Sequence, residues 1–152
     1  MLRKTFLAAL MCWAVPLYAE DTCTLKNNYC VPFIGCTTDG QDYYVGRTFG
    51  RESGELEAQG LSGATCRGTW KRTALGAGRA VFSCSDGVSG RATYTYFDRG
   101  TGTAKGRGRT QSGDRLQFWA AHRIGLFILT EDGLNPDIAA CVRRAIRAQG
   151  SG

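Results

Sequence analysis

The sequence predicts an all-β protein, a small antiparallel meander or barrel of about six to eight strands with one C-terminal α-helix and stapling disulfides. Residues 62–120 alternate between small or apolar residues at even positions and polar, mostly basic residues at odd positions. A period of two indicates a half-buried antiparallel sheet, because successive side chains point to opposite faces. Glycine-containing turn signals divide this segment into five short strands.

The first 19 residues are expected to be a signal peptide that is removed. Arg3 and Lys4 provide a positive start, residues 6–15 are apolar, and Ala19 precedes the expected cleavage point. The apolar run is shorter than the ~20 residues of a membrane span, so no transmembrane span is expected. Residues 10–12 (LMC) lack the small residues of a lipidation signal. We therefore expect residues 20–152 to form a single domain that is periplasmic or secreted.

Six cysteines remain after this leader, and an even number in a small exported domain predicts three disulfides in an oxidising compartment. They are Cys23, Cys30, Cys36, Cys66, Cys84 and Cys141. None of them forms the Cys-x-x-Cys pattern that is typical of metal sites. The sequence therefore predicts no metal site, and it offers no motif for a cofactor.

One disulfide follows from a hairpin. Cys66 and Cys84 lie symmetrically about Leu75, at the centre of a glycine-containing turn, so they are predicted to face each other across two strands. Directly opposed residues have Cα atoms ~4.5–5.5 Å apart, within the range of a disulfide. Cys141 is expected to reach one of the three N-terminal cysteines, and the sequence does not choose which.

The other turns predict pairings in which large inward residues meet small ones. Turns centred on Gly100 and Gly87 predict the pairs Tyr94 with Gly106, Tyr96 with Ala104, Phe82 with Ala92, and Ala80 with Tyr94. The next turn, at Ser112-Gly113, needs a bulge to place Phe118 opposite Gly108.

Outside this segment the signals are mixed. Residues 43–45 and 55–58 fit strands, whereas residues 23–36 are expected to be irregular because Pro32 argues against a central strand. The apolar run 124–130 (IGLFILT) predicts a strand buried on both faces. A helix is predicted over 135–148, with an asparagine cap followed by proline at its first position.

Charge is distributed unevenly along the chain. The 19 basic and 13 acidic residues give a net charge of +6, which falls to +4 without Arg3 and Lys4. Residues 61–126 hold eleven of the basic residues and only three acidic ones, and residues 20–60 are acidic. The odd positions of the sheet thus form a basic outer face, which we define as Arg67, Lys71, Arg79, Arg91, Lys105, Arg107, Arg109 and Arg115. Trp119 is expected on this face beside Arg107, as an aromatic contact for a partner.

No catalytic constellation stands out. His122 is the only histidine, and at the end of a predicted strand it is interpreted as a turn or packing residue. Glu55 and Glu57 share a strand face, but they are interpreted as solvated residues, with Glu57 beside Arg67. These observations favour a protein that is not an enzyme.

The expected function is that of an exported binding protein whose basic face contacts an anionic envelope polymer or an acidic protein partner. The predicted architecture resembles, as a class, the small periplasmic inhibitor barrels, which implies inhibition of an envelope hydrolase as one form of this function. Three alternatives remain: a structural envelope protein, a hydrolase with scattered carboxylates, and a charged face that only keeps the protein soluble. Specific binding of nucleic acid is not expected, and the oligomeric state is left open.

Overall fold

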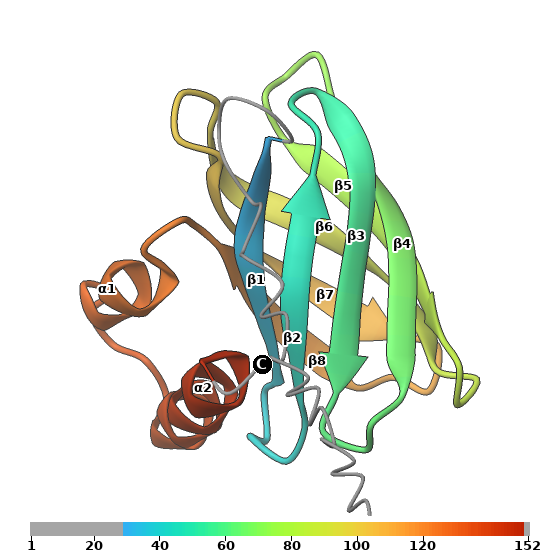
Figure 1. The fold of residues 1–152 in the computed structure, drawn as a ribbon, viewed down its shortest axis with the longest axis vertical. Coiled ribbons are helices and arrows are strands. Elements are labelled where there is room, and N and C mark those ends of the chain that lie inside the picture. The colour runs from blue at the N-terminus through green and yellow to red at the C-terminus, as the bar shows by residue number, and fades with distance from the viewer. Residues whose placement is uncertain (1–28, 151–152) are drawn as a thin grey trace, which may run out of the picture.

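The computed structural model describes residues 29–150, which form a closed eight-stranded antiparallel barrel followed by two helices (Figure 1). The strands are β1 (Cys30–Thr37), β2 (Tyr43–Phe49), β3 (Ser53–Gly60), β4 (Thr65–Arg72), β5 (Gly78–Cys84), β6 (Ser89–Asp98), β7 (Thr103–Thr110) and β8 (Arg115–Ala120). Each strand pairs with the next one in sequence, and β8 pairs with β1. The predicted all-β class is confirmed. The proposed signal peptide lies outside the described residues.

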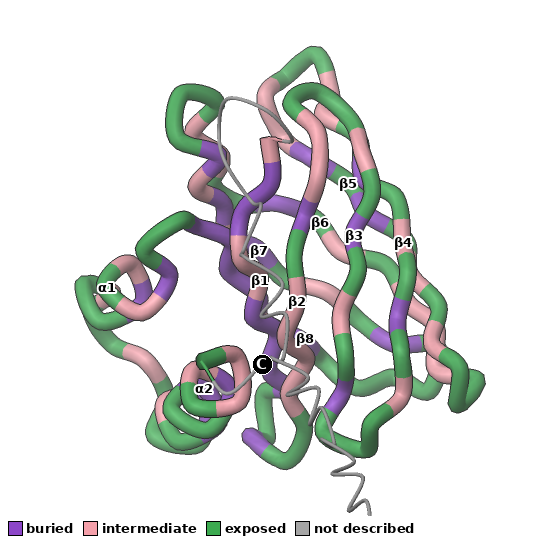
Figure 2. The backbone as a smooth tube through the Cα atoms, in the orientation of Figure 1, coloured by how far each residue is buried: buried purple, intermediate pink, exposed green. Residues whose placement is uncertain are grey.

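The barrel is filled by alternating large and small inward residues. Trp70, Tyr94 and Phe118 are buried, and the Tyr94 ring meets the Phe118 ring edge-on at 5.1 Å between centroids. Phe118 lies over Gly106, where an added Cβ would stand 2.5 Å from the ring. In Figure 2 buried or intermediate positions alternate with exposed ones along β3 and β4. The predicted packing of aromatic rings over glycines is confirmed.

The first predicted hairpin has the expected register. Cys66 pairs with Cys84, Gly68 with Phe82, and Trp70 with Ala80. The two cysteines form a disulfide with an S–S distance of 2.00 Å. The half of the β6–β7 hairpin that is farther from its turn also has the predicted register, with Tyr94 opposite Gly106.

Two other predicted registers are wrong by two residues. Ala80 pairs with Ala92, Phe82 with Gly90, and Phe118 with Gly106 instead of Gly108. The cause is the form of the turns, which have three-residue loops ending in a glycine of left-handed conformation, Gly87 (φ 88°) and Gly113 (φ 102°). Each hairpin is therefore centred on the residue before the glycine.

The β6–β7 hairpin departs from prediction near its turn. Tyr96 pairs with Lys105 instead of Ala104, and Phe97 takes the position opposite Ala104. The loop spans 99–102, one residue longer than a turn centred on Gly100, and a bulge between Tyr94 and Tyr96 restores the register. Tyr96 consequently points outward, where it contacts Phe127.

The prediction for residues 23–36 is wrong where the structure describes them, since β1 begins at Cys30 and includes Pro32. The Pro32 carbonyl accepts a hydrogen bond from the Ala121 N–H, so this residue faces the β8 side, where strand pairing ends at Phe33. Pro32 therefore lies opposite Ala121 at the last position of the β1–β8 ladder, so its missing N–H costs at most one hydrogen bond, at the end of the ladder.

The predicted strand at 124–130 is a short helix instead, α1 (Ile124–Leu129). The barrel is already closed by the β1–β8 pair, so no free strand edge is left for this segment. The C-terminal helix is confirmed as α2 (Pro136–Gln149), with the Asn135 side chain accepting a hydrogen bond from the Asp137 N–H.

Both helices lie on one side of the barrel, and α2 packs against β1 and β2 (Figure 1). A second core forms here between the apolar faces of the helices and Ile34, Cys36 and Trp119. The disulfide Cys36–Cys141 fixes α2 to β1 and confirms that Cys141 reaches an N-terminal cysteine. Cys30 is also disulfide-bonded, and Cys23 lies outside the described residues. Within 29–150, no helix is long and apolar enough to cross a membrane.

Candidate functional site

The basic outer face is carried mainly by strands β4 to β8. Six of its side chains are exposed and form no ion pair with a carboxylate of the described residues 29–150. These six, which we call the open cations, are Lys71, Arg79, Arg91, Arg107, Arg109 and Arg115. Their odd positions put them on the solvent side of the barrel, because the even positions fill its interior.

Strand pairing places several of these cations directly opposite one another. Lys71 faces Arg79 across β4 and β5, Arg91 faces Arg109 across β6 and β7, and Arg109 faces Arg115 across β7 and β8. Like charges in such positions destabilise a sheet, typically by a few tenths of a kcal/mol. These unneutralised cations therefore lower the stability of the fold.

The described part of the acidic segment, residues 29–60, forms strands β1 to β3 and neutralises little of this face. Glu57 lies opposite Arg67, as expected, but the two charged groups are 3.8 Å apart and largely exposed, so the pair is weak. Glu52 instead binds Arg99 at 2.7 Å and Arg72 at 3.6 Å near the β2–β3 loop. Within the described residues, Arg67 is thus the one cation of the basic face that is paired with this segment.

Two of the predicted contact residues do not belong to the open surface. Trp119 is fully buried in the second core, and its Nε1–H donates to the Glu131 carboxylate at 2.6 Å. Lys105 lies opposite Trp119 and binds the same carboxylate at 2.7 Å. Trp119 was expected beside Arg107, which instead faces Gln117. The prediction fails because α1 and α2 cover the outer side of β8, which the sequence did not indicate.

A shallow groove of about 910 Å³ runs over β5, β6 and β7. Its outward-facing lining combines cations, hydroxyls, an amide and one exposed apolar side chain: Arg79, Val81, Ser89, Arg91, Thr93, Arg109 and Gln111. Sequence reasoning passed over the polar members of this set. All three, Ser89, Thr93 and Gln111, occupy odd positions like the cations, and this shared position is the signal that would have included them.

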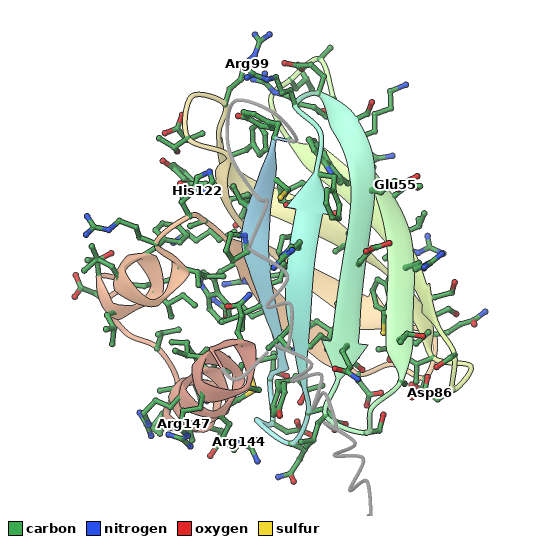
Figure 3. All side chains as sticks on the ribbon, in the orientation of Figure 1. Glu55, Asp86, Arg99, His122, Arg144 and Arg147 are labelled. Atoms are coloured by element: carbon green, nitrogen blue, oxygen red, sulfur yellow. A yellow bond between two sulfur atoms is a disulfide. The ribbon has the colours of Figure 1, made fainter. Side chains whose placement is uncertain are left out.

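The residues considered for catalysis do not converge. His122 is exposed in the turn between β8 and α1, and Glu55 projects from the other side of the barrel (Figure 3). Within residues 29–150, no three His, Cys, Asp or Glu side chains lie close enough together to hold a metal ion.

No protein-family model matches the sequence, and no curated protein matches it. Solved structures with a similar fold include designed β-barrels. One, a de novo design, is 17% identical with a TM-score of 0.48, and the alignment covers 60% of this chain and 89% of that chain. Another, a redesigned barrel called mFAP1 and bound to DFHBI, is 14% identical with a TM-score of 0.49, and the alignment covers 60% of this chain and 91% of that chain.

Proposed function

We propose that this protein is an exported, non-enzymatic binding protein that holds an anionic polymer along its basic outer face. The observation that supports the proposal is the row of open cations, above all the unneutralised Arg91–Arg109 pair. An anionic partner would relieve the repulsion within this row, so binding and stabilisation would favour each other.

The distribution of charge favours a chain over a small anion. The open cations extend across five adjacent strands, from Lys71 on β4 to Arg115 on β8. By strand register they lie in two neighbouring rows, with Lys71, Arg79 and Arg107 in one and Arg91, Arg109 and Arg115 in the other. Strands ~4.8 Å apart give these rows lengths of roughly 14 and 10 Å, enough for a few charged repeats of a polymer. Most of these cations are arginines, whose planar guanidinium binds carboxylate or phosphate through two parallel hydrogen bonds.

The disulfides support an extracytoplasmic partner. Cys36–Cys141 and Cys66–Cys84 are consistent with an oxidising compartment. The proposed partner is therefore an anionic polymer of the envelope or the extracellular space, rich in phosphate or carboxylate groups.

Equilibrium binding of the purified protein to polyphosphate, a polyuronate and neutral dextran tests this function. The protein should bind the two polyanions and should show no binding to dextran. Changing Arg91, Arg107 and Arg109 together to Ser should lower the affinity at least about tenfold. A matched variant that also loses three positive charges, Arg123, Arg143 and Arg147 to Ser, should retain binding.

Equal losses in the two triple variants would contradict the proposal, because they would reflect net charge and not a site. A large fall in melting temperature for the basic-face variant would show that its arginines are paired internally. Salt-resistant capture of a single protein from the envelope fraction would assign the face to an acidic protein, such as a hydrolase, in place of a polymer.

A further inference from the structure

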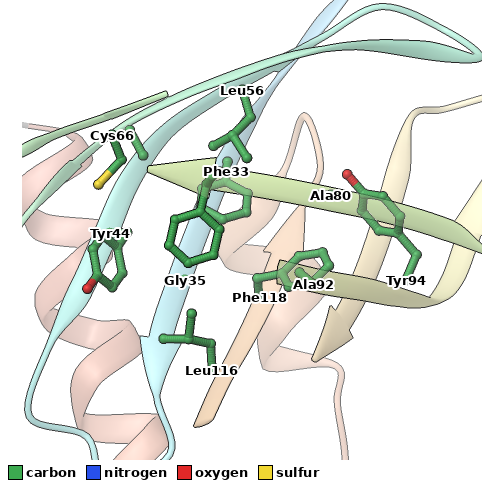
Figure 4. Close-up of a pocket in the computed structure, with 12 residues that line it drawn as sticks. Phe33, Gly35, Tyr44, Leu56, Cys66, Ala80, Ala92, Tyr94, Leu116 and Phe118 are labelled. Carbon is green, nitrogen blue, oxygen red and sulfur yellow. The ribbon is translucent and has the colours of Figure 1, made fainter. Parts of the chain in front are cut away.

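The interior of the barrel contains a cavity that is separate from the basic outer face. Its volume is about 40 Å³, and its lining is almost entirely apolar. Figure 4 shows Phe33, Leu56, Leu116 and Phe118 pointing into a common space. The space exists because the neighbouring lining positions are small: Gly35, Ala58, Ala80 and Ala92. A cavity with so few polar partners holds water poorly and favours an apolar group.

The other end of the barrel is closed. Trp70 fills it and donates its Nε1–H to the Phe49 carbonyl at 2.8 Å. Phe97 packs beside Trp70, and the Arg72 guanidinium covers the Phe97 ring. Access to the cavity is therefore from the opposite end, where the loops 38–42, 61–64, 85–88 and 111–114 meet and the inward-facing Tyr44 and Phe82 are only partly buried.

That open end is acidic. Its four loops contain Asp39, Asp42, Asp86 and Asp114 but no Lys or Arg. Arg144 contacts the Gly40 and Gln41 carbonyls from α2, and Arg115 begins β8 on the outer face. Burial raises the pKa of the Tyr44 hydroxyl at the cavity wall, and the negative charges of Asp42, Asp86 and Asp114 raise it further. The aspartates thus act on the cavity mouth, whereas Arg91, Arg109 and Arg115 lie on the outer face of the strands that adjoin these loops.

We infer that this end of the barrel is a second binding site, for a small ligand with a short apolar tail and a cationic head group. The tail would fill the cavity between Leu56, Ala92 and Leu116, and the head group would remain among the aspartates at the mouth. Removing the tail from water supplies affinity, while the carboxylates select the sign of the charge. The site lies inside the barrel and does not depend on the function proposed for the basic face.

Three probes with the same four-carbon tail test the inference: butylammonium, butanol and pentanoate. Binding is followed by methyl NMR shifts of Leu56, Leu116 and Ala80, which line the cavity. Butylammonium should bind most tightly and pentanoate least. Asp86→Asn combined with Asp114→Asn should weaken butylammonium roughly fivefold and leave butanol unchanged.

Filling the cavity should abolish binding of all probes. Ala92→Leu does so, with Ala58→Val as a milder second variant, while Ala140→Leu on the exposed side of α2 makes the same addition elsewhere and should change nothing. Equal affinities for the three probes would overturn the charge selection. Absence of shifts at the cavity methyl groups, or shifts that survive both filling variants, would overturn the site itself.

Discussion

Arg91 lies directly opposite Arg109 across β6 and β7, and no carboxylate within the described part of the chain forms an ion pair with either side chain. Changing Arg91 to Thr removes this repulsion and keeps a residue that suits a strand. We expect the free energy of unfolding to rise by about 0.2–1 kcal/mol, measured by urea denaturation at low salt. The same change at Arg67, which has Glu57 nearby, should give no gain. A loss of stability for Arg91→Thr would show that its guanidinium has a stabilising role.

The disulfide between Cys66 and Cys84 should contribute substantially to stability. It closes a loop with a sequence separation of 18 residues, for which chain entropy gives about 3 kcal/mol. Replacing both cysteines by Ala should lower the free energy of unfolding by about this amount, and the barrel should still form because strand pairing does not depend on the bond. Denaturation monitored by circular dichroism provides the measurement. An unchanged midpoint would mean that the unfolded chain is already constrained in this region.

Tyr94 should make the protein sensitive to alkali. Burial raises the pKa of its hydroxyl well above the ordinary value near 10. The unfolded chain therefore loses this proton at a lower pH than the folded one, so stability is full below pH ~10 and falls as the pH rises above that value. Tyr94→Phe should reduce the loss of unfolding free energy between pH ~10 and ~11.5, in brief measurements that precede disulfide exchange. An identical alkaline decline in both proteins would contradict the assignment to Tyr94.

The register of each hairpin could be predicted correctly only where the centre of its turn was placed on the right residue. For Cys66 and Cys84 the centre at Leu75 is correct, because Leu75 is the middle residue of a three-residue loop that ends in Gly76 (φ 82°). The same arrangement occurs in the turn that contains Gly87, where placing the centre on the glycine itself moved the register by two residues. The predicted inward and outward positions are still correct, because a register shift of two residues leaves every side chain on the same face of the sheet.

The helices account for the part of the site that sequence reasoning placed wrongly. Alternation along β8 correctly separates Phe118, which faces the interior, from Trp119, which faces outward. Alternation does not reveal that the outer side of β8 is covered by α1 and α2, because that depends on packing between segments distant in sequence. A tryptophan followed closely by an apolar run is as compatible with a second core as with a binding surface.

The dependence of polyphosphate affinity on salt tests the proposed function most directly. Binding by the open cations releases counterions, so the logarithm of the association constant should fall linearly with the logarithm of salt concentration, with a slope of roughly −0.7 to −0.9 for each cation engaged. The variant with Arg91, Arg107 and Arg109 changed to Ser should have a slope smaller in magnitude by about 2. An affinity that is independent of salt, or a slope unchanged in this variant, would contradict the account.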